Sequence, residues 1–142
     1  MNDTMIDIIV GSLVFDSWIE AGPELRADHA EDRHLIYEGG GIILDLLLKK
    51  ADNGACLHVG GQVLPNERSL NAVSDLTVTM EHGRKREQTH TNALGEFTFH
   101  AVPNGSFDLN IRLRNRRFSV RGLSSSEPRM WRVTPSLAMG GD

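Results

Sequence analysis

The sequence has a single cysteine and no long, uninterrupted apolar run. Cys56 is the one cysteine among 142 residues, which excludes an intramolecular disulfide and a cysteine-based zinc cluster within one chain. The apolar run IILDLLL is interrupted by Asp45. It is far shorter than the roughly 20 residues that a membrane helix needs. We therefore expect no membrane span, and the cysteine count fits a reducing compartment.

The N-terminus also lacks the features of a secretory signal. Asp3 stands where such a signal carries positive charge, and Asp7 interrupts the apolar run before it reaches signal length. We expect a soluble, cytoplasmic protein.

Length and charge describe a single domain with two differently charged parts. A chain of this length buries roughly two thirds of the surface that its unfolded form exposes. Residues 1–48 hold ten acids and two arginines, a net charge of −8, while residues 49–142 hold thirteen bases and nine acids, a net charge of +4. This asymmetry is typical of an acidic interaction segment on a basic body. Two independently solvated surfaces would explain it equally well.

Composition divides the chain into three parts. Residues 1–33 join an apolar segment, MIDIIVGSLVFDSWI, to the polar AGPELRADHAED, which has no sustained apolar period. We interpret them as an N-terminal arm followed by a linker or a short, frayed helix. Residues 34–134 form the predicted folded domain, and residues 135–142 a flexible tail.

Short alternating segments predict an all-β domain. Two apolar runs, 42–49 and 55–64, flank the hairpin signal Asp52-Asn53-Gly54. Gly60-Gly61 predicts a bulge or a change of sheet, and the charged HGRKRE is interpreted as a turn. Alternation continues at 76–80, 97–101, 107–113 and 118–120. We predict an antiparallel, Ig-like β-sandwich of about seven to eight strands with an extended N-terminal arm.

Residues 56–123 resemble a known family. The segments GQVL, LTVTM, THTNALGEFTF, VPNGSFDLNI and FSVRGL are similar, in this order, to the carboxypeptidase regulatory-like domain, a transthyretin-like sandwich. Its most specific part is the pair Thr-x-x-x-Gly-x-Phe and Pro-x-Gly-x-Phe, in which Gly95 and Gly105 would reverse the chain and return Phe97 and Phe107 to one core. Phe107 stands where the family often has tyrosine. The resemblance implies a non-catalytic accessory or interaction module, and it leaves envelope association open because the family is common in envelope proteins.

No residue pattern predicts catalysis, a cofactor or a bound metal. The histidines lack the close His-x-x-x-His spacing that places two ligands on one element, although His90 and His100 lie on flanking strands and could approach one another. Cys56 lies in an apolar run without a local base, and the glycines at 39–41 precede a strand rather than a phosphate-binding helix. We expect a protein that is not an enzyme.

Arginines gather in the C-terminal third. Seven lie between Arg112 and Arg132, opposed only by Glu127. If Leu113 and Phe118 face inward, the outward face of two adjacent strands carries Arg112, Arg114, Arg117 and Arg121. The acidic whole protein and the few interleaved aromatics disfavour nucleic acid as the partner. A solvated face or a protein-binding patch is expected instead.

The N-terminal arm supplies a second candidate interaction surface. Its segment SLVFDSWIE combines acids with large apolar side chains that can anchor a peptide in a groove or add it to a sheet edge: Leu13, Val14, Phe15, Trp18 and Ile19. The alternative is that this segment packs on its own domain as an extra strand or helix.

These observations lead to one hypothesis and two alternatives. We hypothesise a non-enzymatic adaptor or regulatory subunit that docks through the arm and the basic face onto another protein or a second copy of itself. The first alternative is a small carbohydrate- or ligand-binding module, since sandwiches often carry loop-borne sites, although its aromatic platforms are limited to Trp18, Tyr37 and Trp131. A nucleic-acid-binding module that uses the 112–132 stripe is less favoured.

Overall fold

The computed structural model describes residues 7–19, 32–51, 54–66 and 72–124. It contains ten strands, which are, in chain order, β1 (Asp7–Val10), β2 (Ser12–Asp16), β3 (Asp32–Gly39), β4 (Ile42–Ala51), β5 (Cys56–Pro65), β6 (Thr77–His82), β7 (Lys85–His90), β8 (Glu96–Pro103), β9 (Phe107–Arg112) and β10 (Arg116–Leu123). The predicted linker at 21–32 and tail at 135–142 lie almost wholly outside the described residues.

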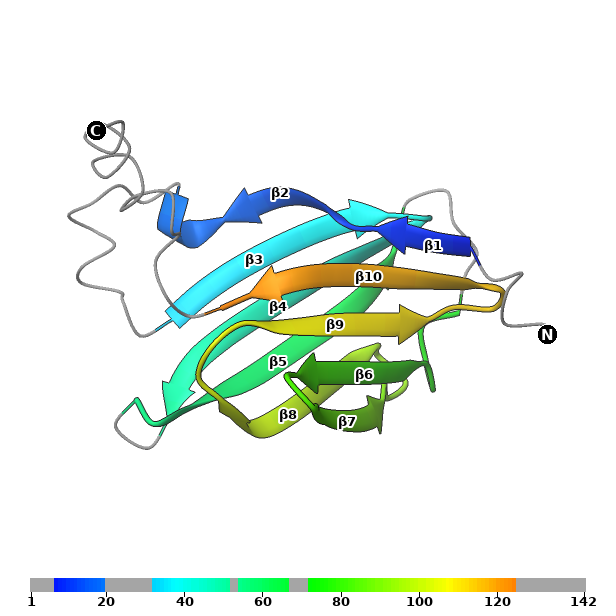
Figure 1. Ribbon diagram of the computed structural model, residues 1–142. Coiled ribbons are helices and arrows are strands. Elements are labelled where there is room, and N and C mark those ends of the chain that lie inside the picture. The colour runs from blue at the N-terminus through cyan, green and yellow to red at the C-terminus, as the bar shows by residue number, and fades with distance from the viewer. Residues whose placement is uncertain (1–6, 20–31, 52–53, 67–71, 125–142) are drawn as a thin grey trace, which may run out of the picture.

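The strands form two sheets of five that face one another (Figure 1). The first sheet has the order β1-β10-β9-β6-β7, and the second has the order β2-β3-β4-β5-β8. Every pairing is antiparallel except that of β1 with β10, which is parallel. The predicted all-β, antiparallel sandwich is confirmed.

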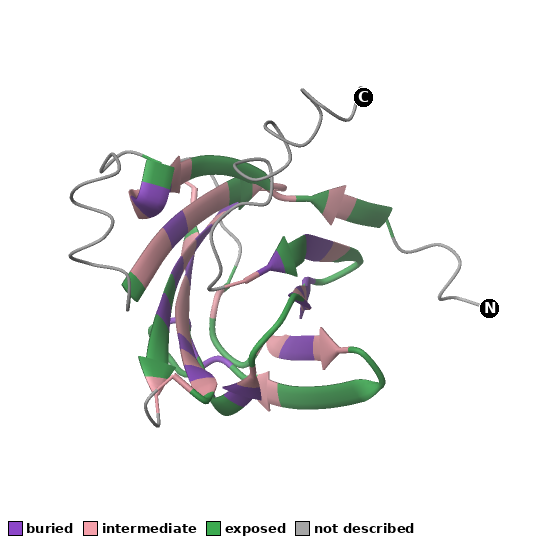
Figure 2. Ribbon diagram, turned by 60° about the vertical axis from the view of Figure 1, so that its left-hand side comes forward, coloured by how far each residue is buried: buried purple, intermediate pink, exposed green. Residues whose placement is uncertain are grey.

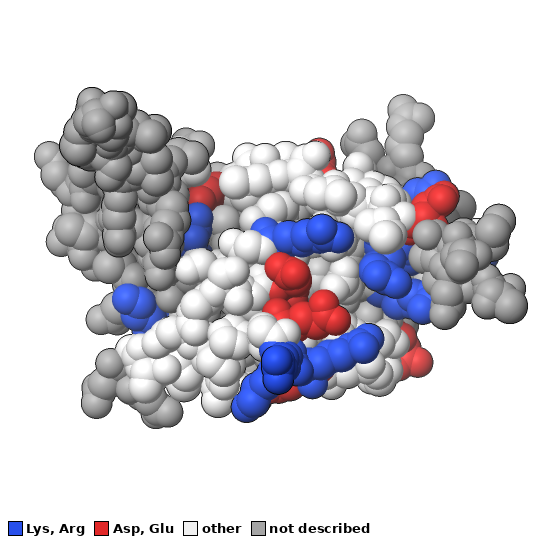
Figure 3. Space-filling view, in the orientation of Figure 1, with Lys and Arg blue, Asp and Glu red and all other residues white. Residues whose placement is uncertain are grey.

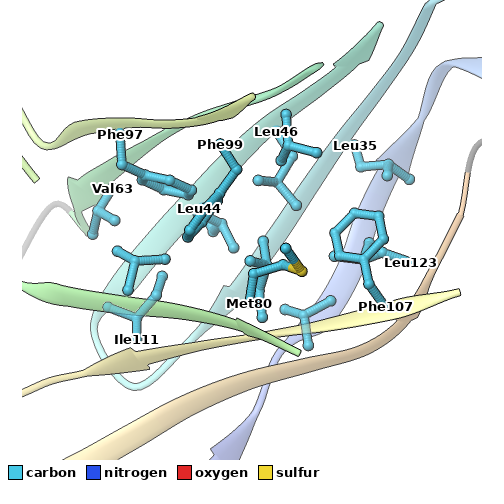
Figure 4. Close-up of a cluster of buried hydrophobic side chains, with 14 of the residues drawn as sticks. Leu35, Leu44, Leu46, Val63, Met80, Phe97, Phe99, Phe107, Ile111 and Leu123 are labelled. Atoms are coloured by element: carbon cyan, nitrogen blue, oxygen red, sulfur yellow. The ribbon is translucent and has the colours of Figure 1, made fainter. Parts of the chain in front are cut away.

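Strict alternation along the central strands builds the core. In β4 the side chains of Ile42, Leu44, Leu46 and Leu48 are buried while those between them face outward, and β9 follows the same period. Figure 2 shows this alternation as bands along the strands, and Figure 4 shows apolar side chains of both sheets meeting between them. Each fully buried leucine or phenylalanine stabilises the fold by about 1.5–3 kcal/mol relative to an exposed one.

Strand β7 was predicted as part of a charged turn, and that interpretation was too broad. The tight turn occupies Gly83 and Arg84, and Lys85 already pairs with His82 of β6. The sequence KREQTH has no apolar alternation because β7 is an edge strand exposed along nearly its whole length (Figure 2). Its strand character comes from pairing with β6, which the local pattern does not encode.

Gly60-Gly61 is neither a bulge nor a change of sheet. Strand β5 pairs through both glycines, with β4 on one side and β8 on the other. A side chain on Gly61 would overlap the ring of Phe97, so this glycine makes room for an aromatic ring in the core. The bulge lies nearby on β8, where His100 and Ala101 together oppose His58 and Ala101 has a φ of 56°.

The Thr-x-x-x-Gly-x-Phe segment ties the β7–β8 connection to the rest of the molecule. The Thr91 hydroxyl donates to the carbonyl of Val73 at 2.6 Å and accepts from the amide of Leu76 at 2.8 Å. Gly95, with a φ of 82°, accepts from the amide of Val63 at 2.8 Å and lies against the Val63 carbonyl. A glycine is required there because a Cβ would overlap that carbonyl oxygen.

We therefore expect Gly95→Ala to lower the free energy of unfolding by about 2–3 kcal/mol, because it adds both a positive-φ strain and a clash with backbone. Gly60→Ala is the matched control, since a Cβ there meets nothing within 4 Å, and it should change stability by less than about 0.5 kcal/mol. Urea denaturation followed by circular dichroism measures both. Equal losses in the two variants would contradict this account of Gly95.

Candidate functional site

The N-terminal segment joins both sheets. Strand β1 lies beside β10 in one sheet, and after Gly11 the chain enters the other sheet as β2 beside β3 (Figure 1). The Gly11 amide donates to the Ser119 carbonyl at 2.9 Å, and a Cβ on Gly11 would lie 2.6 Å from the ring of Phe118. For residues 7–19 the structure therefore shows the alternative in which the segment packs on its own domain as extra strands.

Ile9 anchors the first half of this segment. It packs against the core beside Phe118, with which it is paired in register. Its side chain fills the space beside Gly39 and Gly40 at the β3–β4 turn, where a Cβ on Gly40 would lie 2.5 Å from Ile9 Cδ1. Ile9 thus closes one end of the open side between the two sheets.

A buried ion pair anchors the second half. Asp16 is 3% exposed and accepts from Arg33 through both carboxylate oxygens, at 3.1 and 2.6 Å. The Arg33 guanidinium also donates to the Ser124 carbonyl and lies 4.6 Å from the centre of the Trp18 ring. The two-point geometry orients the arginine as well as neutralising the buried carboxylate.

Trp18 is buried in the same cluster. Trp18 is 4% exposed, its amide donates to Asp16 and its indole Nε1 donates to the Asp32 carbonyl at 2.9 Å. Phe15 is half-buried with its ring 5.3 Å from that of His34. Of the predicted docking residues, Trp18 is therefore part of the domain's own packing.

The charges of this cluster change the pKa of Tyr37. Burial raises the pKa of the Tyr37 phenol above its usual 10.0, the Arg33 charge lowers it and the Asp16 charge raises it. Because this is the chain's one tyrosine, its titration is a direct readout of the environment around the ion pair.

The remaining large apolar side chains of the segment are exposed. Five of the seven exposed large hydrophobics among the described residues lie here, and we call them the N-terminal edge: Ile8, Val10, Leu13, Val14 and Ile19. Val10 is 66% exposed and Val14 is 53% exposed. The sequence pointed to Leu13, Val14 and Ile19 but not to Ile8 and Val10, whose outward orientation follows from the parallel register with β10.

The other two sheet edges carry features that oppose pairing with another chain. Strand β7 presents charged and polar residues, and β8 has its bulge at Ala101 and ends in Pro103. Charged side chains, bulges and prolines all protect an edge strand against added strands. Among the exposed residues of β1 and β2 only Asp7 is charged, and β2 has a bulge at Val14. The N-terminal edge is therefore the least charged and most apolar of the sheet edges.

The predicted basic face is divided by the structure. Arg112 and Arg117 are direct cross-strand partners on the outer face of the first sheet. Arg121 lies at a bulge of β10, where Gly122 donates to the Asp108 carboxylate at 2.9 Å. Arg114 lies in the β9–β10 turn, between Leu113 and Arg116. Figure 3 shows basic and acidic side chains interspersed over this sheet rather than one continuous basic stripe.

A polar hollow of about 220 Å³ opens on this outer face. Three cross-strand rows of residues cross it. Arg117, Arg112 and Thr77 form the first row, Asn110, Thr79 and Gln88 the second, and Glu81 and Arg86 the third. The hollow thus has an arginine pair at one end, neutral hydrogen-bonding groups in the middle and an oppositely charged pair at the other end, whose side chains are 3.8 Å apart.

The outer face of the second sheet is acidic and partly apolar. A shallow hollow of about 420 Å³ lies over Gly60, between Leu47 and Thr98, with Asp45 and Glu96 at its margin. Asp45 also contacts His34 Nε2 at 2.7 Å.

The histidines are arranged differently from the prediction. His100 lies beside His58, with Nδ1 atoms 3.3 Å apart, while His90 belongs to the other sheet, paired with Thr77. Within the described ranges, no three His, Cys, Asp or Glu side chains are grouped so that they could hold a metal ion. His29 lies outside those ranges.

Comparison with known proteins gives no relative: no family model, curated protein or solved structure matches the chain. The resemblance to the carboxypeptidase regulatory-like domain therefore stays a prediction. Over the part of the chain that the structure describes, no helix is long and apolar enough to cross a membrane.

Breaking the Asp16–Arg33 ion pair should weaken the packing of β2 against the rest of the domain and so destabilise the fold. We expect Asp16→Asn to lower the free energy of unfolding by about 3 kcal/mol, because it removes the buried carboxylate that accepts two charge-assisted hydrogen bonds from Arg33. Glu81→Gln is the control, since its pair with Arg86 is exposed and should contribute less than about 1 kcal/mol. Denaturant titration of both variants gives the comparison, and similar values for the two would contradict the role of Asp16.

Tyr37 gives a second test through pH. Ultraviolet absorbance of the phenolate should report an apparent pKa above 10.0 in the folded protein. Since the folded pKa lies above the unfolded one, the contribution of Tyr37 to stability is complete below pH 10 and is lost as pH rises further. Tyr37→Phe should therefore lose less stability than wild type between pH 10 and 11. A folded-state pKa at or below 10.0 would show that the phenol is not buried as described.

Proposed function

We propose that this protein is a non-enzymatic interaction module, of the adaptor or regulatory-subunit kind, that docks through its N-terminal edge. Its partner is a protein chain, either a different protein or a second copy, that adds a strand to this edge. The observation that supports the proposal most strongly is the concentration of exposed apolar side chains on the N-terminal edge, whose exposed residues include a single charge, Asp7.

Strand addition suits this edge for two reasons. Among the described strands, β1 pairs only with β10 and β2 only with β3, so their outward backbone groups can pair with a strand of another chain. Exposed side chains such as Val10 and Val14 would then be covered by the added chain. The anchors at Ile9 and Asp16 hold the edge rigid, which lowers the ordering cost of binding.

Nucleic acid is less well supported as a partner. Arg114 is separated from the other predicted arginines by its place in the turn, and Asp108 and Glu81 lie on the same face as Arg112 and Arg117. Acids within the face oppose a polyanion, and His90 is the one aromatic ring among the described outer residues of this sheet that could stack on a base.

The experiment is a comparison of Val14→Lys with Leu94→Lys. Both replace an exposed apolar residue by the same charge, but Leu94 lies in the β7–β8 connection, away from the edge. We expect Val14→Lys to weaken association about tenfold or more, because a lysine would be buried against the added strand, while Leu94→Lys leaves it unchanged. Sedimentation equilibrium over a concentration series measures self-association, and affinity capture with both variants measures a different partner.

A dimer lost only in Val14→Lys would identify the second copy as partner. A captured protein lost only with Val14→Lys would identify a different one. A monomer at all concentrations with captures that are identical for wild type and both variants would contradict the proposal. Circular dichroism melting checks that each variant is folded.

A further inference from the structure

The outer face of the first sheet contains an arrangement that the fold does not need. Arg112 and Arg117 lie directly opposite one another on β9 and β10. Like charges in directly opposed positions destabilise a sheet. Among the described residues neither arginine makes an ion pair.

Acids on this face are too far away, and too occupied, to compensate the pair. Asp108 lies four residues from Arg112 along β9, roughly 13 Å at the rise of an extended strand, and its carboxylate accepts from the Gly122 amide. Glu81 is at the same far end of the hollow and is paired with Arg86. The two arginines therefore line the same end of the hollow as direct cross-strand partners, and among the described residues no acid stands in their row.

The middle of the hollow is lined by neutral groups that can donate or accept hydrogen bonds. Asn110, Thr79 and Gln88 stand in register on three neighbouring strands, one row from the arginines, and we call them the neutral row. Two amides and a hydroxyl bind hydroxyl groups well. Their row is separated from the arginine row by about 7 Å, the span of two residues along a strand.

We propose that Arg112 and Arg117 bind the oxyanion of a small hydroxylated phosphate or carboxylate, with the neutral row binding its hydroxyl groups. Two guanidinium forks offer several charge-assisted hydrogen bonds to one planar or tetrahedral oxyanion. A volume of about 220 Å³ accommodates a ligand of a few carbon atoms rather than a polymer. The β1 part of the N-terminal edge adjoins this site, because Ile8 is paired with Arg117, whereas Val14 lies on β2 in the opposite sheet, so Val14→Lys tests docking without altering the site.

Calorimetric titration of the full chain tests the site with four probes: glycerol 3-phosphate, inorganic phosphate, glycerate and glycerol. Glycerol 3-phosphate or glycerate should bind more tightly than inorganic phosphate, because each adds hydroxyls to the oxyanion, and glycerol should not bind. The tighter of the two organic anions identifies phosphate or carboxylate as the preferred group.

Arg112→Gln and Arg117→Gln should each weaken that binding about tenfold or more, since each removes charge-assisted hydrogen bonds. Arg114→Gln is the matched control, because it makes the same charge change in the β9–β10 turn, and it should bind as wild type does. A further readout is stability: the Arg117→Gln melting temperature should equal or exceed that of wild type, because the repulsion between the arginines is removed.

Three results would overturn the site. Equal weakening by Arg114→Gln would show a diffuse basic surface of the kind that attracts any polyanion. No binding of any probe at millimolar concentration would show that the hollow is only solvated. A lower melting temperature for Arg117→Gln would show that the pair stabilises the sheet. Unchanged ligand binding by Val14→Lys separates a failure here from a failure of the docking proposal.

Discussion

The sandwich depends on how its open side is covered between β10 of one sheet and β3 of the other. One segment does this for both sheets, because it passes from the first to the second at Gly11. Gly11 has no room for a side chain beside Phe118, so the crossing requires a glycine. On either side of it, Ile9 fills the space at the β3–β4 turn and the Asp16–Arg33 pair fixes the end of β2.

The same covering strands create the exposed edge. A strand that closes a sheet has one bonded side and one free side. In β1 the exposed Ile8 and Val10 flank Ile9, and in β2 the bulge at Val14 leaves Ser12, Leu13 and Val14 all exposed. Ile8 and Val10 are exposed because Ile9 between them is committed to the interior. The exposed apolar surface is thus a direct result of the way in which the sheets are closed, and the scarcity of charge on it, with Asp7 as the one exposed charged residue of β1 and β2, is the property that favours a partner.

Much of the fold could be predicted from the sequence wherever a strand faces the core on one side. Strands β4 and β9 alternate cleanly, and the Gly95 and Phe97 spacing matched a real constraint, the contact of Gly95 with the Val63 carbonyl. Strand β7 could not be predicted, because an edge strand without apolar residues has no period. The role of Gly61 depends on the ring of Phe97, 36 positions later in the chain, which no local window contains.

The candidate surfaces were only partly predictable, for related reasons. Arg112 and Arg117 were correctly expected to share a face, since alternation and a short hairpin determine their pairing. Arg114 was placed with them by the same alternation, but the strand had already ended. Trp18 was expected either in a docking surface or packed on its own domain, because an apolar segment fits both. Its burial depends on Arg33 and Asp32, beyond the intervening residues 20–31.

The central claim is that the N-terminal edge pairs with a strand of another chain. Amide hydrogen exchange of residues 12–16 tests it most directly, compared between dilute and concentrated protein and between protein alone and protein bound to a captured partner. The account predicts that amides not bonded to β3 exchange fast in the isolated chain and become protected on association. Unchanged exchange at these amides in a demonstrated complex would contradict it.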